Sequence, residues 1–255
     1  MHTMAHIKKK SREKTGIETD FLKRSCTVTP RECAYFPEII SPIEEVFLWH
    51  GYLSPEQTDD YLARGWRRSS WYFYRNSCPE CRRCLPIRLE MDAFRTSKSQ
   101  RRILRKNENT KFRLFKPMDF AEKYIRKSLE IHNRFLRVRY KKSPRHMDEY
   151  FSEFFLSPVE TIVSAMFING MLAGNGFLDL GKTSISTVYF SFDPHFSEFS
   201  PGTFSVLKEI EWARTHGIRY YYLGYLIREL SSMRYKGSFR PFELLNPDTG
   251  IWERQ

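Results

Sequence analysis

Residues 161–180 read TIVSAMFINGMLAGNGFLDL, and this stretch decides the fold. Its first eight residues are apolar and rich in β-branched side chains, which favours a strand over Thr161–Ile168. Asn169-Gly170 follows, and this pair between two apolar runs is the strongest short signal for a hairpin turn. The return strand is therefore expected over Met171–Leu180, with a bulge at Asn175-Gly176.

The pattern continues toward the C-terminus. A third strand is predicted over Ile185–Phe192. Ser200-Pro201 then begins a helix, with Ser200 as its cap, and the apolar residues of this helix recur on one side until Gly217 ends it. A buried strand follows over Arg219–Leu223, and Gly224-Tyr225 is expected to break it. Hairpin, strand, helix and strand make a mixed α/β unit, an order that also occurs in the GNAT acyltransferase fold with its splayed pair of strands.

The first half of the chain has weaker signals. Ser54 and Gln57 form a capping box for a helix that runs to Ala63. Further elements are expected in this order: strands over Ser70–Tyr74 and Ile87–Met91, a long helix over Asp119–Arg139 and a short helix over Met147–Leu156. The domain organisation inferred from this is a flexible basic arm over residues 1–20, a cysteine-bearing α+β domain over 21–115 and a GNAT-like domain over 116–255.

The charge balance favours a polyanionic partner. The chain has 255 residues, with 42 Lys and Arg against 30 Asp and Glu, a net charge of +12. An excess of this size points to nucleic acid before a membrane surface, with a solubility bias as the alternative. No run of about 18 apolar residues occurs, and the basic N-terminus lacks an apolar core, so neither a membrane span nor a secretory signal is expected. A cytoplasmic location follows, in which cysteines are usually reduced, catalytic or metal-bound.

Three of the five cysteines lie in residues 65–88, GWRRSSWYFYRNSCPECRRCLPIR. Two residues separate each from the next at Cys78, Cys81 and Cys84, which brings three sulfurs onto one tight loop. Thiolates bind soft ions, and structural zinc and iron–sulfur clusters usually take four ligands. The candidates for a fourth ligand are Cys33, Cys26 and a histidine such as His50. Small buried thiols without a metal are the alternative.

Positive charge is concentrated in residues 95–113, where eight Lys and Arg residues stand against Glu108 alone. A solvated helix face usually mixes signs, so this stretch favours contact with phosphate over a plain exposed face. The candidates for phosphate contacts are Arg101, Arg102, Arg105 and Lys106.

Five blocks of the sequence, in this order, closely resemble the aminoacyl-tRNA–protein transferases. That family includes the eukaryotic arginyltransferases and the bacterial aspartate/glutamate leucyltransferases. The blocks are residues 65–88, FRTSKSQRRILRKN (94–107), STVYFSFDP (186–194), SPGTFSVLKEIEWAR (200–214) and YYYLGYLIRELSSMRYKGSFRPFELL (220–245). The resemblance covers roughly Cys33 to Trp252.

The resemblance implies that an amino acid leaves charged tRNA and joins the α-amine of a protein that begins with Asp or Glu. This transfer would mark the target for degradation through the N-degron route. The cysteines linked in the family to a metal or an iron–sulfur cluster correspond here to Cys33, Cys78, Cys81 and Cys84. The spacing of the cysteines looks like the bacterial branch, whereas the ending looks as much like the arginyltransferases. Leucine and arginine therefore both stay open as the transferred amino acid.

This chemistry makes modest demands on the protein. The donor ester is activated and the nucleophile is an amine with a pKa of about 8, so positioning and oxyanion stabilisation can suffice. Asp193 is a candidate to orient the amine, with a turn before Pro194 as the alternative. The acidic side chain of the acceptor needs a fixed cation, since a guanidinium grips a carboxylate with two hydrogen bonds. The candidates for that cation are Arg67, Arg68 and Arg88, each with a surface ion pair as the alternative.

Further contacts are expected from tyrosines and from the last basic residues. Tyr74, Tyr189 and Tyr225 are candidates to line the pocket or to stack on the terminal adenine, with a place in the core as the alternative. Arg234 and Lys236 are placed to meet phosphate near the acceptor end of the tRNA.

Two other functions compete with this one. The first is a CoA-dependent acetyltransferase, but the stretch that corresponds to its pyrophosphate loop, HFSEFSPGTF, has one glycine, so CoA is not expected. The second is a non-catalytic RNA-binding protein with a zinc-ribbon-like element. The oligomeric state stays open.

Overall fold

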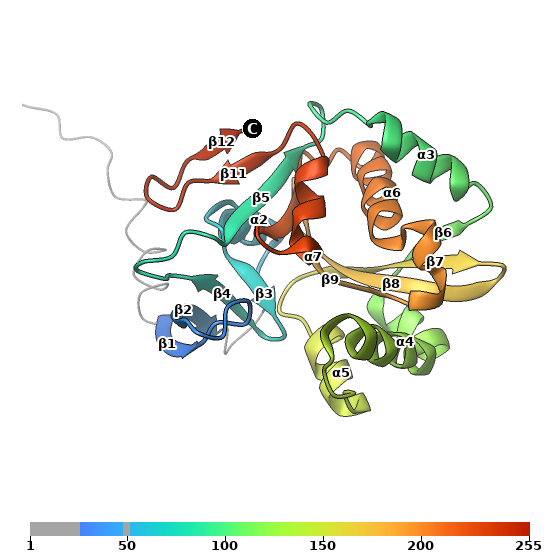
Figure 1. Ribbon diagram of the computed structural model, residues 1–255, viewed down its shortest axis with the longest axis horizontal. Helices are drawn as coiled ribbons and strands as arrows, with labels where there is room; N and C mark the ends of the chain where they lie inside the picture. The colour runs from blue at the N-terminus through green and yellow to red at the C-terminus, as the bar shows by residue number, and fades with distance from the viewer. Residues whose placement is uncertain (1–25, 48–51) are drawn as a thin grey trace, which may run out of the picture.

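The structure, a computed structural model, describes residues 26–47 and 52–255 (Figure 1). The arm expected over residues 1–20 and the candidate ligand His50 lie outside the described residues. Two sheets organise the rest. The smaller sheet is antiparallel with the order β1-β2-β4-β3. Its strands are β1 (Cys26–Glu32), β2 (Ile40–Phe47), β3 (Arg67–Ser69) and β4 (Tyr72–Asn76).

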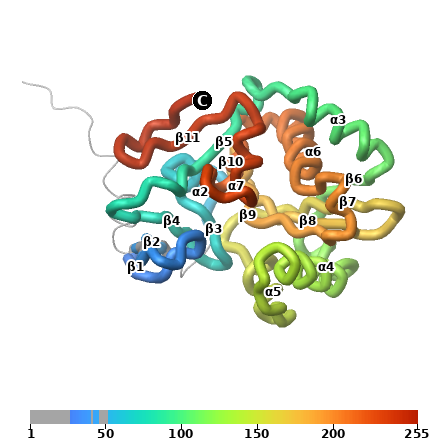
Figure 2. Tube along the Cα trace, in the orientation of Figure 1, coloured from blue at the N-terminus to red at the C-terminus, as the bar shows by residue number. Residues whose placement is uncertain are grey.

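The larger sheet has eight strands in the order β12-β11-β5-β10-β9-β8-β7-β6. Its strands are β5 (Leu85–Glu90), β6 (Lys111–Phe115), β7 (Thr161–Ile168), β8 (Met171–Leu180), β9 (Ser184–Phe192), β10 (Tyr220–Leu226), β11 (Glu243–Leu245) and β12 (Trp252–Arg254). The tube in Figure 2 shows how β5 from the first half of the chain lies beside β10 and β11 from its end. The large sheet therefore takes strands from both sides of residue 115.

Helices cover both faces of the large sheet. Helices α3 (Lys98–Lys106) and α6 (Pro201–Thr215) lie on one face, while α4 (Pro117–Tyr140) and α5 (Met147–Phe154) lie on the other (Figure 1). The remaining helical segments are α2 (Pro55–Ala63), α7 (Ser231–Arg234) and the 3₁₀ turns η1 (Pro194–Phe199) and η2 (Tyr235–Ser238). No helix in the described part of the chain is long and apolar enough to cross a membrane.

Each face of the sheet has its own apolar core. Alternate residues of β7 point to opposite faces, so Val163 packs with α4 and α5 while Met166 packs with α3 and α6. The short signals in the sequence are confirmed by the structure. The Asn169-Gly170 turn has positive φ at both residues, and Ser54 and Gln57 cap α2 reciprocally.

The relation between β9 and β10 decides where a site can form. The two strands are parallel and joined through α6, and they pair only where Tyr220–Tyr222 lies beside Ser184–Ser186. Beyond this point β9 stays paired with β8 and β10 with β5, but the two strands no longer pair with each other, so they separate like the arms of a V. A mixed α/β fold with a splayed parallel pair confirms the GNAT-like fold expected from the sequence.

Four local predictions are wrong. The strand expected over Ser70–Tyr74 begins only at Tyr72, because Ser70, with a positive φ of 50°, lies in the turn between β3 and β4. Gly224 does not break β10, because its positive φ of 91° absorbs a register shift against β5 and the strand continues to Leu226. Asn175-Gly176 is not a bulge. Asn175 accepts a hydrogen bond from Ser128 and stays in register, and the shifts involving β8 occur elsewhere. Ser200 precedes α6 in a left-handed conformation, and its side chain makes no capping hydrogen bond.

Candidate active site

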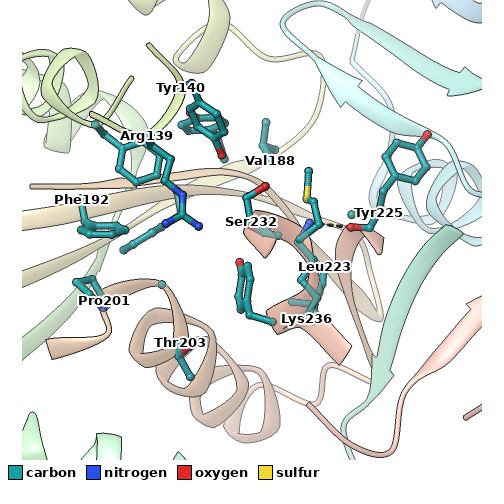
Figure 3. Close-up of a pocket in the computed structure, with 18 of the residues that line it drawn as sticks. Arg139, Tyr140, Val188, Phe192, Pro201, Thr203, Leu223, Tyr225, Ser232 and Lys236 are labelled. Atoms are coloured by element: carbon teal, nitrogen blue, oxygen red, sulfur yellow. Dashed lines mark hydrogen bonds between the residues drawn. The ribbon is translucent and has the colours of Figure 1, made fainter. Parts of the chain in front are cut away.

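A cavity of about 490 Å³ lies where β9 and β10 separate (Figure 3). Its lining comes from both arms of the V, the start of α6, the end of α4 and η2, together with residues of the small sheet. Apolar side chains form a large part of the wall. They are Phe135, Val188, Phe190, Phe192, Leu223 and Met233.

Arg67 enters this cavity from the small sheet. It lies on β3 and donates a hydrogen bond from Nη2 to the carbonyl oxygen of Thr187 at 2.5 Å. Thr187 directly follows the part of β9 that pairs with β10, so the guanidinium lies at the base of the V. Gly224 makes this approach possible, because a Cβ there would lie 2.9 Å from Nη1. Nη1 is itself buried and has no hydrogen-bond partner among the described residues.

Lys236 reaches the same cavity from η2, on the side of β10. Its Nζ donates a hydrogen bond to the carbonyl oxygen of Tyr225 at 3.0 Å, which Figure 3 shows as a dashed line. Burial, reinforced by the nearby charge of Arg67, lowers the pKa of Lys236 to about 7. The sequence prediction that Lys236 meets tRNA phosphate thus lacks structural support, since the amine points into the cavity.

The three tyrosines predicted from the sequence all line this cavity, at Tyr74, Tyr189 and Tyr225. Burial raises the pKa of each, so the phenols stay protonated and act as hydrogen-bond donors. The hydroxyl of Tyr225 is buried without a partner among the described residues. Unsatisfied buried groups of this kind are uncommon in folded proteins.

The cavity is cationic. Its lining contains Arg67, Arg139 and Lys236, and no Asp, Glu or His among the described residues. Sequence reasoning missed Arg139, which ends the long helix α4, and Tyr35, which follows Cys33 by two residues. A run of basic residues at the end of α4 is the only sequence signal for Arg139, and it resembles an ordinary helix terminus.

The structure does not bring Arg68 or Arg88 to the cavity. Arg68 donates from Nε to both carboxylate oxygens of Asp179, at 2.8 and 2.9 Å, and both side chains are almost fully buried. Arg88 pairs with Glu243 at 2.7 Å. Its guanidinium lies 4.0 Å from the ring centre of Tyr220. Both arginines have internal partners in place of a substrate.

Asp193 lies beside the cavity but is not part of its wall. Its carboxylate accepts a hydrogen bond from the backbone of His195 at 3.1 Å and pairs with Arg134. These contacts fix the start of η1, which agrees with the turn-forming alternative for this residue. The geometry gives Asp193 no direct contact with a substrate amine in this cavity.

The basic helix α3 carries an exposed positive face. Arg101, Arg102, Arg105 and Lys106 are all exposed, and Lys106 pairs with Glu198 at 3.2 Å. The end of α3 is tied to η1, because the side chain of Asn107 donates to the carbonyl oxygen of Phe199 at 2.9 Å. Since η1 leads into the cavity at Ser200, the basic face lies close to the cavity rim. Arg234 is also exposed and bonds a neighbouring backbone carbonyl.

A second, smaller cavity of about 210 Å³ brings four cysteines together. Its lining includes Cys33, Cys78, Cys81 and Cys84, and its wall shares Tyr35 and Tyr74 with the larger cavity. Burial and the three neighbouring thiols raise the pKa of Cys84 to about 12. Within residues 26–47 and 52–255, no three Cys, His, Asp or Glu side chains are already arranged to hold a metal ion.

Comparison with known proteins identifies the family. Residues 31–102 match the family described as arginine-tRNA-protein transferase, N terminus, and residues 127–246 match its C terminus. An aspartate/glutamate leucyltransferase of Campylobacter jejuni is 31% identical over 90% of this chain and 95% of its own. The chain belongs to the aminoacyl-tRNA–protein transferase family. The present chain is also 37% identical to an aspartate/glutamate leucyltransferase of Saccharophagus degradans, over 71% of this chain and 76% of the relative.

Solved structures with related shapes include FemX, at a TM-score of 0.46 and 8% identity over 82% of each chain. L-PGS from Bacillus licheniformis has the same TM-score and 12% identity, over 67% of this chain and 50% of its own. Family membership makes the transferase an enzyme that uses charged tRNA as its donor. It thereby sets aside both competing functions, the acetyltransferase and the non-catalytic RNA-binding protein.

Proposed function

We propose that the transferase moves leucine from leucyl-tRNA to the α-amine of proteins that begin with aspartate or glutamate. The observation that carries this proposal is the charge of the cavity, where the guanidinium groups of Arg67 and Arg139 line the wall and no carboxylate does among the described residues. The names of the relatives, aspartate/glutamate leucyltransferases, support the same assignment. The product would carry an N-terminal leucine that marks it for degradation through the N-degron route in the cytoplasm.

The acidic side chain of the acceptor fits at Arg67. A carboxylate in the cavity would lie beside the Arg67 guanidinium, and Arg139 adds a second positive charge to the wall. A charged hydrogen bond in a buried site contributes more than one in water, because the surroundings have a low dielectric constant.

The leucine side chain fits the apolar wall formed by residues such as Phe135, Val188 and Leu223. An arginine donor would bring a third guanidinium group into the cavity, beside Arg67 and Arg139. Without a carboxylate in the described lining, that charge would be desolvated and repelled. The cavity therefore favours leucine over arginine as the transferred amino acid.

The chemistry of transfer needs little from the protein beyond position. The acceptor amine attacks the ester carbonyl carbon, the new C–N bond forms and the C–O bond to the ribose breaks. The phenols of Tyr74 and Tyr189 line the cavity and stay protonated, so they are hydrogen-bond donors in its wall. Donors held in place in this way can stabilise the oxyanion that develops in the transition state.

A zinc ion or an iron–sulfur cluster on the cysteines is a second part of the proposal. Four thiols lining one cavity are a suitable donor set for either group. A bound cation would also favour the thiolate form of Cys84, which the three other thiols oppose. The group would be held by Cys33, Cys78, Cys81 and Cys84 and would brace the wall that carries Tyr35 and Tyr74.

A transfer assay tests the assignment. Purified transferase receives labelled leucyl-tRNA or arginyl-tRNA together with peptides that begin with Asp, Asn, Glu or Gln. We expect leucine to move to the Asp and Glu peptides, and the nearly isosteric Asn and Gln peptides to react about 100-fold less well, since they lack the charge that Arg67 would pair. Transfer of arginine in place of leucine, or equal rates with Asp and Asn peptides, would contradict the proposal.

A further inference from the structure

The proposed transfer releases a proton for which the machinery described so far has no acceptor. The α-amine of the acceptor has a pKa of about 8, so most of it arrives as an ammonium ion near pH 7. An ammonium ion has no lone pair and cannot attack an ester. A group in the cavity that removes this proton would raise the reactive fraction of the bound amine.

The cavity offers few groups for this task. Its described lining contains no Asp, Glu, His or Cys, and burial raises the pKa of the tyrosines Tyr35, Tyr74, Tyr189, Tyr225 and Tyr235 above the ordinary value of a phenol. Arginine does not lose its proton in proteins, which excludes Arg67 and Arg139. One group remains that can accept a proton near pH 7, the amine of Lys236.

We propose that Lys236 is the proton acceptor for the α-ammonium of the acceptor protein, with Arg67 and the carbonyl of Tyr225 as its positioning groups. The Nζ atom lies in the opening of the V and donates to the carbonyl oxygen of Tyr225 at 3.0 Å. A neutral amine can give one hydrogen to this carbonyl and turn its lone pair toward the cavity. The proposal rests on the transfer reaction stated above.

The surroundings of Lys236 support a neutral amine. The titratable groups that share its cavity are cationic or phenolic. They are Arg67 from β3, Arg139 and Tyr140 from α4, Tyr35, Tyr74 from β4, Tyr189 from β9, Tyr225 from β10 and Tyr235 from η2. Burial and the charge of Arg67 bring the pKa of Lys236 to about 7, so about half of it is neutral at that pH. A catalytic base is most effective when its pKa lies near the working pH.

The proton balance closes with this assignment. The α-ammonium gives one proton to Nζ, and the neutral amine attacks the ester carbonyl carbon. When the C–O bond breaks, the second proton of the attacking nitrogen goes to the departing ribose oxygen. Lys236 then returns its proton to water, so each turnover releases one proton.

The test compares pH profiles of leucine transfer by wild-type protein and by Lys236→Arg and Lys236→Gln. For the wild type we expect kcat/KM to rise as the pH passes about 7 and to level off above about 8, because Lys236 must be neutral to take the proton and the acceptor amine is already neutral above its own pKa. Both variants should lose about 10-fold at pH 7, because only about one tenth of the acceptor amine is neutral there without the base. Their residual rate should rise through about pH 8 and not through about pH 7, since it depends only on neutral acceptor amine.

Two controls separate this role from others. Lys182→Gln removes an exposed lysine paired with Glu56 and should keep the wild-type profile. The affinity of Lys236→Gln for leucyl-tRNA should match the wild type, because a proton acceptor does not bind phosphate. A variant profile parallel to that of the wild type, or a loss of tRNA affinity, would overturn the proposal. An inactive wild type would instead count against the proposed function.

Discussion

Arg67 and Arg68 are adjacent in the chain, but one lines the cavity and the other forms a buried ion pair. Successive residues of a strand point to opposite faces of the sheet, so Arg67 on β3 turns toward the V and Arg68 turns toward Asp179. Sequence reasoning proposed both for the same task, and strand geometry allows only one of them to face the cavity. The Arg68 pair is buried, with 0% and 1% of the two side chains exposed.

This burial predicts a structural role for Arg68. Replacing Arg68 by alanine would leave the Asp179 carboxylate buried without its cation, which should lower the free energy of unfolding by about 3–5 kcal/mol. Urea denaturation measures this loss. Arg64→Ala is a matched control, since Arg64 and Asp60 form an exposed pair one helical turn apart, and it should cost about 0.5 kcal/mol or less. A stable Arg68→Ala protein without transfer activity would return Arg68 to the substrate site.

At the scale of elements, the helix α3 holds exposed positive charge close to the rim of the cavity. Its end is fixed to η1 through Asn107, and η1 leads to the residues that begin α6 at the cavity rim. If the cavity takes the aminoacyl end of the tRNA as proposed, an exposed basic helix beside it is well placed to contact the phosphates of the acceptor stem. Such contacts supply affinity that falls steeply as salt displaces them.

The contribution of α3 is measurable with a triple variant, Arg101→Gln, Arg102→Gln and Arg105→Gln. We expect weaker binding of leucyl-tRNA, with an unchanged kcat at saturating tRNA. The plot of log affinity against log salt should become less steep by about 2, since each lost phosphate contact removes about 0.7 from the slope. The matched control neutralises three exposed residues of α4: Lys123, Arg126 and Lys127. Equal effects of the two triple variants would show that net charge, and not α3, attracts the tRNA.

The elements themselves follow from local signals to a large extent. The Asn169-Gly170 turn and the Ser54 capping box each depend on residues within four positions, and the structure confirms both. The cavity depends on distant contacts. Arg67 meets Thr187 across 120 residues of sequence, and no periodic pattern reports which strands spread apart. The three tyrosines that line the cavity lie in the blocks that resemble the family and could be predicted from them. The sequence predicted Lys236 only as a phosphate contact, because its place in the cavity depends on the position of η2.

At the scale of the whole molecule, the cysteine cavity joins separate parts of the chain. Cys33 follows β1, whereas the other three cysteines lie between β4 of the small sheet and β5 of the large sheet. A metal or cluster bound by all four would hold these segments together. A ligand that binds the folded state and not the unfolded state stabilises a protein, and the gain grows with the logarithm of the ligand concentration divided by its Kd.

Metal analysis of protein purified without oxygen tests this part of the proposal. We expect zinc, or iron with sulfide, bound to each chain, and a lower melting temperature after chelation. Cys33→Ser should lose the bound metal, whereas Cys26→Ser, the matched control, should keep it. Full metal content in Cys33→Ser, or its loss in Cys26→Ser, would remove Cys33 from the ligand set.

The entry of Arg67 into the V also bears on how specificity is inherited. Consider a chimera that takes the residues before 116 from one relative and the remaining residues from another. Its cavity wall would combine side chains from both parent proteins. Such a hybrid would take Arg67 and Tyr74 from the first parent, and Thr187, Gly224 and Lys236 from the second. Preferences for donor and acceptor would therefore not separate cleanly between the two halves, and the residues facing each other across the V would have to be exchanged together.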